Sequence, residues 1–211
     1  MASVKSGVLG PVARSNEPAI FQVFVRRGRS FRRAPFEQRL YVLRRRATKA
    51  AHALVGRHET LPRGFHLISL SSRTLVYKGM LIPEQLSAYF PDLRDPTLAS
   101  ALAVVHSRFS TNTLPEWHLA QPLRMLCHNG EINTERGNRN WWSSSEALFS
   151  SKDFGADLDH VRPVMTPGDS DSKSLDAAVE LLVHGGRTLP EAVMLMIPEA
   201  WQHEGEPGTG P

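Results

Sequence analysis

The apolar stretch Ala101-Leu102-Ala103-Val104-Val105 is followed directly by the polar run His106-Ser107-Arg108-Phe109-Ser110-Thr111-Asn112-Thr113. A second apolar stretch, Leu123 to Cys127, is followed by the polar cluster His128-Asn129-Gly130-Glu131-Ile132-Asn133. Short apolar runs of this kind are typical of buried strands, and we expect the polar residues at their ends to form a site on a rigid scaffold. An arginine can bind a carboxylate through two parallel hydrogen bonds, and an Asn amide with a Gly N–H can face an oxyanion. The pattern predicts a site for a small substrate with carboxylate and carbonyl groups.

The order of the remaining elements favours an α+β fold, because strands and helices do not alternate as regular β-α-β units. Period-2 and apolar-run patterns predict strands, and helical spacing predicts helices. Strands are expected at 17–26, 65–70, 74–78, 101–105 and 123–127, and helices at 36–55, at Pro83–Leu86 and at 138–149.

The last third of the sequence is expected to be helical. Ser172 is the expected N-cap of one helix, and Gly185-Gly186 its C-terminal stop. Thr188 and Glu191 form a capping box for a second helix, which should continue to Pro198.

The basic charge of the chain is concentrated in one region. The formal net charge is +4, and arginines and lysines gather between Arg26 and Lys49. On the helix expected at 36–55, an apolar stripe should be buried while the arginines lie mostly on the solvated face. Binding to a polyanion, or to another part of the protein, are the alternatives. Aromatic residues that could stack on bases are not interleaved with the arginines, so a nucleic acid is not an expected partner.

Other classes of function are disfavoured by composition. With 211 residues, 41% of them hydrophobic, the chain can form one core. No stretch approaches the ~18–20 apolar residues of a membrane span, and the start does not resemble a signal peptide. The one cysteine, Cys127, fits a reducing cytoplasm. No spacing of Cys and His resembles a metal or iron–sulfur site.

Four ordered motifs carry a resemblance to a known family. HSRFSTNT, HNGEINTERGN, PGDSDSKSLDAAVELL and MLMIPEAWQ resemble the glutaminase domain of glutamate synthase large subunits, a class II glutamine amidotransferase with an N-terminal-nucleophile fold. The resemblance extends from about Leu9 to Gln202. It implies a domain at 9–202, with an N-terminal tail at 1–8 and a disordered C-terminal tail at 203–211. The implied architecture is an αββα sandwich, incomplete at its N-terminus.

The resemblance also implies roles for individual residues. Arg108 and Asp171 match the groups that hold the carboxylate and amino group of glutamine, and Thr111 matches a further substrate contact. Asn129 and Gly130 match the oxyanion hole. From local pattern alone, Arg108 could instead be an ion-pairing group, Asn129-Gly130 a tight turn with positive φ, and Asp171 a charge favourable to a helix N-terminus.

One departure from the family concerns the nucleophile. Family members begin, after processing, with a cysteine whose thiol attacks glutamine, whereas this sequence begins Met1-Ala2-Ser3. Cys127 lies at the end of an apolar run, where a buried thiol is the expected role. The chain alone is therefore expected to be inactive, as a domain fragment that lacks its nucleophile. A missing segment supplied in trans is a further alternative.

Two functions remain open. The first is the glutaminase part of a glutamate synthase, which releases ammonia from glutamine for transfer to 2-oxoglutarate. The resemblance implies that the intact enzyme carries FMN and an iron–sulfur cluster in a separate synthase domain and takes electrons from NADPH, NADH or ferredoxin. The second is a non-catalytic glutamine-binding or interaction remnant.

Overall fold

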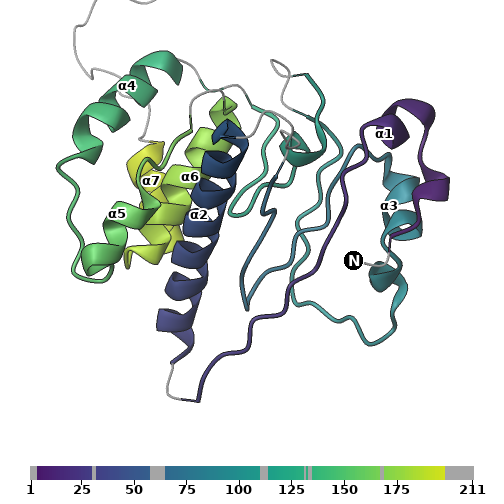
Figure 1. Cartoon of the computed structure of the whole chain (residues 1–211), viewed down its shortest axis with the longest axis horizontal. Coiled ribbons are helices and arrows are strands. Elements are labelled where there is room, and N and C mark those ends of the chain that lie inside the picture. The colour runs from purple at the N-terminus through teal and green to yellow at the C-terminus, as the bar shows by residue number, and fades with distance from the viewer. Residues whose placement is uncertain are drawn as a thin grey trace, which may run out of the picture.

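The computed structural model describes residues 4–29, 32–57, 65–109, 114–130, 132, 135–166 and 169–197. Helices α2, α5, α6 and α7 lie together on one side, and α1 and α3 lie on the opposite side, with long extended segments between (Figure 1). The α-helices are α1 Pro11–Ser15, α2 Arg33–Arg57, α3 Pro83–Tyr89, α4 Glu135–Glu146, α5 Leu158–Val161, α6 Asp171–His184 and α7 Leu189–Met196. The 3-10 turns are η1 Ser6–Val8, η2 Pro91–Arg94, η3 Trp117–Leu119 and η4 Gly155–Asp157.

Helix α2 contains the helix expected at 36–55, but it buries only part of the expected apolar stripe, which comprised Phe36, Leu40, Leu43, Ala47, Ala50, Ala51 and Leu54. Leu40 of that stripe is buried, together with Glu37, Tyr41 and Arg44, whereas Leu43 and Leu54 of the stripe are exposed. The arginines were expected mostly on the solvated face, and Arg44, only 3% exposed, is an exception. The physical reason is that α2 packs against α6, which presents a carboxylate to Arg44.

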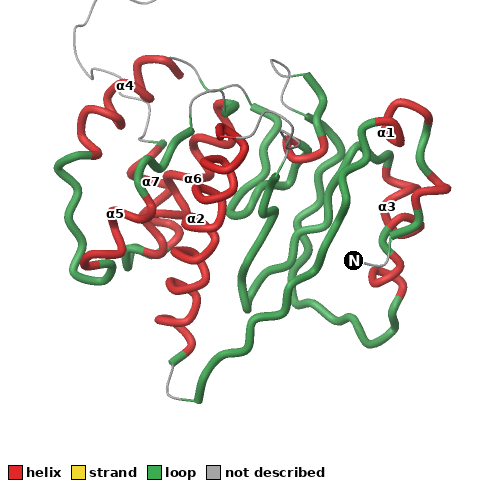
Figure 2. The backbone as a smooth tube through the Cα atoms, in the orientation of Figure 1, coloured by secondary structure: helices red, strands yellow, loops and turns green. Residues whose placement is uncertain are grey.

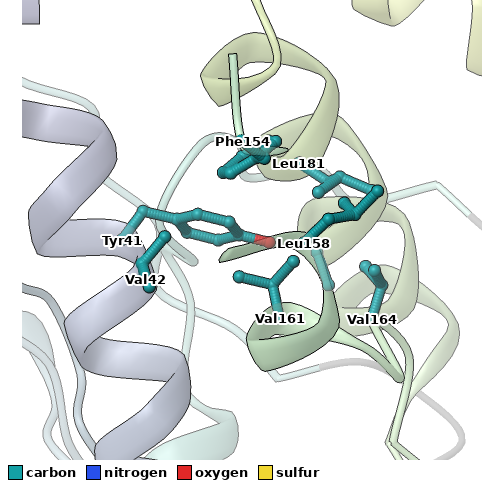
Figure 3. Packing of buried hydrophobic residues seen from close by; sticks show 8 residues of the cluster. Tyr41, Val42, Phe154, Leu158, Val161, Val164 and Leu181 are labelled. Carbon is teal, nitrogen blue, oxygen red and sulfur yellow. The ribbon is translucent and has the colours of Figure 1, made fainter. Parts of the chain in front are cut away.

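The larger core joins α2 to α5 and α6. Side chains of Tyr41, Val42, Phe154, Leu158, Val161, Val164 and Leu181 meet there (Figure 3). The Tyr41 ring also stacks on His184 at the end of α6, with ring centroids 4.7 Å apart. Complete burial of one such apolar side chain contributes about 1.5–3 kcal/mol, so this cluster is a main source of stability for the helical side.

A smaller core surrounds α3. Tyr89, Phe90 and Trp117 are buried with Leu9, and Val4 and Val8 pack against them. Lys5 N–H donates to the Tyr89 carbonyl at 2.9 Å, so residues 4–8, assigned by the sequence to a tail, lie against α3.

The ring of Trp117 in this core leaves no room for a side chain at Gly79. A Cβ at Gly79 would lie 2.4 Å from the Trp117 ring, and this close approach requires glycine.

The strands predicted from the sequence are not formed within the described residues. The segments at 17–26, 65–70, 74–78 and 101–105 are extended but are drawn as loops (Figure 2), and no backbone hydrogen bond joins them in the described ranges. The prediction of a buried run at 101–105 is wrong, since Leu102 is 77% exposed. Apolar side chains on such a run become buried only when a second layer covers them. The α+β sandwich therefore remains an expectation.

The run at 123–127 is a turn around a buried carboxylate. The backbone N–H groups of Arg124, Met125 and Leu126 donate to Asp176 Oδ1 at 3.1, 2.8 and 3.2 Å. Leu123 is buried, as expected, and its N–H donates to the Leu126 carbonyl. Three successive donors cannot converge on one oxygen while they also form a strand ladder, so the strand prediction is wrong here.

The helices of the last third begin and end close to their predicted positions. The N-cap of α6 is Ser170 rather than Ser172, and its Oγ accepts from the Lys173 N–H at 3.2 Å. Gly185 is the C-cap, and Gly186 has a φ of +99°, a conformation that favours glycine. The capping box of Thr188 and Glu191 is confirmed at the start of α7.

The helix predicted at 138–149 is also present, as α4. It begins and ends three residues earlier than expected. The ring of Phe149 lies beyond its end, in edge contact with Trp142.

Candidate functional site

The loop that carries Asn129 and Gly130 is fixed by one buried glutamine. Gln121 Oε1 accepts from the His128 N–H at 2.9 Å, and Gln121 Nε2 donates to the His128 carbonyl at 3.0 Å. The side-chain amide of Gln121 thus forms two hydrogen bonds with one backbone residue, as a neighbouring strand would. These two bonds hold the backbone of His128, the residue before Asn129, in place. The start of the candidate oxyanion hole is therefore positioned by Gln121 even though 123–127 forms no strand.

Asn129 and Gly130 offer open hydrogen-bond donors. Both residues are exposed, and neither the Asn129 amide nor the Gly130 N–H bonds to a residue in the described ranges. Gly130 does not adopt a positive φ, so the alternative of a tight turn that needs glycine is not what the structure forms. A Cβ at Gly130 would meet only His128 Nδ1, at 3.7 Å. Two donors that face solvent are free to bind a substrate carbonyl.

Asp171 begins α6 and connects that helix to the same loop. Its Oδ2 accepts from the Ile132 N–H at 3.4 Å. Its Oδ1 accepts from the N–H of Ser172 at 2.6 Å and from the Ser172 hydroxyl at 3.1 Å. An ionised carboxylate can accept about four hydrogen bonds, which leaves room for one more donor such as an ammonium group. The helix dipole favours the negative charge at this position.

The contact between Asp171 and Ile132 brings two of the sequence-predicted groups close together. Gly130 is two residues from Ile132, so their Cα atoms lie within about 7 Å of each other. The structure thus places the candidate oxyanion donors near the candidate amine-binding carboxylate, although they are about 40 residues apart in sequence.

Arg108 lies in an exposed position. Its guanidinium makes no hydrogen bond or ion pair with the residues that the structure describes, so the ion-pair alternative has no partner in those residues. The Arg108 N–H contacts His106 Nδ1 at 3.1 Å, which keeps this part of the chain locally bent. No contact in the described ranges joins Arg108 to Asp171, and Thr111 lies outside them.

The groups next to the site have defined environments. Cys127 is a free, half-buried cysteine, two residues before Asn129. His128 Nε2 is buried and lacks a hydrogen-bond partner among the described residues.

Sequence reasoning missed a charged network behind the site. Arg44 of α2 forms a buried ion pair with Glu180 of α6, and Arg124 Nη1 lies 4.0 Å from Asp176 Oδ2. Burial, and then repulsion by Glu180, raise the pKa of Asp176. Burial also opposes the charge on Glu180, but Arg44 and Arg124 outweigh that effect and lower its pKa. The sequence did contain a signal for this network. Asp176 and Glu180 lie four residues apart within the apolar stretch of α6, and acids buried in such a stretch require partners of opposite charge.

Neither a metal centre nor a membrane span is found in the described part of the chain. It contains no group of three or more His, Cys, Asp or Glu side chains that could hold a metal ion. None of its helices has the length and hydropathy needed to cross a bilayer.

Comparisons with known proteins identify the family. Residues 1–207 match the family described as glutamine amidotransferases class-II, and the chain belongs to that family. It is 45% identical over 207 residues to a glutamate synthase [NADH] of Saccharomyces cerevisiae, and 45% identical over 199 residues to the glutamate synthase [NADPH] large chain of Bacillus subtilis. A chloroplastic ferredoxin-dependent glutamate synthase 2 of Arabidopsis thaliana is 42% identical over 200 residues.

The matches cover nearly all of this chain and a small part of each relative. They span 95%, 94% and 95% of the chain, in the order given above, but only 9%, 13% and 12% of the three relatives. The family assignment therefore concerns one domain of much longer proteins.

Proposed function

We propose that the chain is the glutamine-binding and amide-hydrolysing domain of a glutamate synthase. The observation that carries the proposal is the contact between Asp171 and Ile132, which brings a carboxylate and the Asn129-Gly130 loop to one place in a class II glutamine amidotransferase domain. The three relatives named above are glutamate synthases whose names give three different electron donors, NADH, NADPH and ferredoxin. They support a glutamate synthase as the parent enzyme without favouring one donor.

The proposed roles follow from charge and donor type. Asp171 binds the ammonium group of glutamine, and Arg108 binds its carboxylate through two parallel hydrogen bonds. The Asn129 amide and the Gly130 N–H then receive the side-chain carbonyl oxygen as it becomes an oxyanion. Thr111 is a further substrate contact on the basis of resemblance alone. We assign no nucleophile to Cys127, because the family uses the thiol of an N-terminal cysteine.

The fold and the parent reaction are part of the same proposal. The domain adopts the αββα sandwich of N-terminal-nucleophile hydrolases when its extended segments pair. In the parent enzyme, ammonia released here is transferred to 2-oxoglutarate, and FMN, an iron–sulfur cluster and NADPH, NADH or ferredoxin supply the reduction elsewhere in that enzyme. A cytoplasmic location is consistent with the single cysteine.

A second candidate is a glutamine-binding or interaction remnant without catalysis. It is favoured by one observation: the 211 residues contain a single cysteine, which is internal and half-buried. Under this alternative Arg108 and Asp171 would still bind glutamine, but no thiol would attack it.

Ammonia release from glutamine tests the two candidates. A polypeptide of these 211 residues is expected to release none, while a version preceded by a cysteine-led family segment is expected to hydrolyse glutamine. In the active version, Asn129→Ala should lower the rate by about 10²–10³, the usual effect of removing one oxyanion donor, with an unchanged melting temperature. Cys127→Ala is the matched control and should keep full activity.

Three results would contradict the proposal. If the extended version folds and stays inactive, the second candidate, a remnant without catalysis, is correct. If Asn129→Ala keeps full activity, the oxyanion assignment is wrong. If activity is lost in Cys127→Ala, the assignment of the thiol is wrong.

A further inference from the structure

A cavity of about 190 Å³ is lined by none of the candidate site residues Arg108, Asn129, Gly130 and Asp171, and nothing in the proposed glutaminase chemistry uses it. Its lining comes from α2, from the N-terminal part of α6, from the turn at Leu123 and Arg124, and from the extended segments that carry His66 and Lys78. The cavity is smaller than the roughly 300–1,000 Å³ typical of drug-sized ligands, so it fits a small ion with ordered water.

Cationic side chains dominate the walls of this cavity. Five of them line it, and three carboxylates lie beside them, which leaves an excess of two positive charges when Lys78 is protonated. The cations are Arg44, Arg45, Lys78, Arg124 and Lys173, and the carboxylates are Asp169, Asp176 and Glu180.

The excess charge belongs to two identifiable side chains. Arg44 pairs with Glu180, Arg124 lies near Asp176, and Lys173 pairs with Asp169 at 2.6 Å. The Arg45 guanidinium donates to the Val161 carbonyl at 2.9 Å and has no acidic partner in the described ranges.

Lys78 has even fewer partners. It makes no hydrogen bond or ion pair with the residues that the structure describes. Burial, with repulsion by Arg124 and Lys173, lowers the pKa of Lys78 to about 7. A buried ammonium group without a partner is costly, and a bound anion would remove that cost.

Two stacked histidines add neutral hydrogen-bond donors to the wall. The rings of His66 and His118 are 3.6 Å apart. Burial lowers the pKa of His66 to about 4 and, with repulsion by His66, that of His118 to about 3. Although His118 lies 3.1 Å from a Glu116 oxygen, this contact is therefore a hydrogen bond of a neutral imidazole rather than an ion pair. Neutral imidazoles can bind an oxyanion without adding charge.

We propose that this cavity binds a small free oxyanion with two negative charges, of the size of inorganic phosphate. Lys78 and Arg45 are the two cations that it neutralises, and the guanidinium of Arg124 is a third contact. Asp169 and Lys173 line this cavity, and Asp171, which lies between them in sequence, belongs to the candidate glutamine site, so the two sites share the N-terminus of α6. The proposal does not depend on glutaminase activity.

Thermal melting of the 211-residue chain at pH 7.5 tests the proposal. Sodium phosphate at ten times its Kd stabilises the chain by about 1.4 kcal/mol, which is expected to raise the melting temperature by about 3–6 °C relative to sodium chloride at the same ionic strength. Lys78→Met should weaken phosphate binding about 10-fold or more, the usual effect of losing a charge-assisted contact, while the exposed Lys152→Met should bind like the unaltered chain.

Titration calorimetry supplies a second measurement that does not depend on stability. One phosphate per chain is expected, and Arg45→Gln should weaken it in the same direction as Lys78→Met. Equal responses to phosphate and chloride, or equal affinities of Lys78→Met and Lys152→Met, would overturn the proposal. A response to adenosine monophosphate that depends on Lys78, with none to phosphate, would overturn the assignment to a free ion.

Discussion

The helical side of the molecule buries its apolar side chains, whereas the extended segments leave similar side chains exposed. On the helical side, α2, α5 and α6 bury Leu181 and even the guanidinium of Arg44. In the extended segments, Leu102 and Val105 are largely exposed although their sequence is more apolar than that of α2. A helix satisfies its own backbone and needs only a neighbour for one face, whereas an extended segment needs both a pairing edge and a covering layer. Hydropathy alone therefore does not decide which side chains of this protein are buried.

The largest expected effect comes from the buried ion pair of the helical side. Glu180→Ala leaves the Arg44 guanidinium buried without its carboxylate, which typically costs about 3–5 kcal/mol of unfolding free energy. Asp157→Ala is the matched control, because its partner Arg39 is mostly exposed and such pairs contribute about 1 kcal/mol or less. Urea denaturation measures both, and equal losses would mean that Arg44 is solvated.

A Leu→Ala substitution can be made both in the helical core and in an extended segment. Leu181→Ala removes a core side chain and should cost about 2–5 kcal/mol, whereas Leu102→Ala should leave the free energy of unfolding within about 0.5 kcal/mol. Denaturation of the two variants at one pH gives the difference directly. A large loss for Leu102→Ala would show that the extended segments are covered in solution.

The candidate site allows a binding test. If Arg108 binds the glutamine carboxylate, Arg108→Ala should remove about 1.5–3 kcal/mol of binding free energy, which is about 10–150-fold in Kd. Titration calorimetry with glutamine provides the measurement. The exposed arginine Arg136 supplies a matched control, and its alanine variant should keep the affinity. Equal affinities for the two variants would remove the assigned role of Arg108.

The histidine pair predicts how stability depends on pH. Because the pKa values of His66 and His118 are lowered to about 4 and 3, the unfolded chain binds more protons below its ordinary imidazole pKa of about 6.5. The free energy of unfolding should therefore fall as pH decreases from 6.5 toward 4, by at most about 1.4 kcal/mol per pH unit for each imidazole.

Variants separate this effect from general acid sensitivity. His118→Phe should flatten the dependence between pH 6.5 and 4, while the exposed His160→Phe should not. Denaturant titrations at several pH values are the measurement. Parallel curves for the two variants would show that the pKa values of the half-buried His66 and His118 are not lowered.

Local sequence patterns predicted the family and the longer helices, with their ends correct to within about three residues. The capping box of Thr188 and Glu191, the glycine stop at 185–186 and the proline at the start of α3 act through neighbouring atoms, so local chemistry suffices to predict them. It also identified Arg108, Asn129, Gly130 and Asp171 as candidate site residues through ordered motifs, and their roles stay predictions.

Which charges are buried and which apolar runs are covered depends on tertiary packing. Arg44 and Glu180 are far apart in sequence, and so are Asp176 and the three N–H groups that it accepts from. Hydropathy assigns such groups to the surface, because an isolated charge is costly to bury. Burial becomes possible when a distant segment brings the opposite charge or the donors, and that depends on packing rather than on any local pattern.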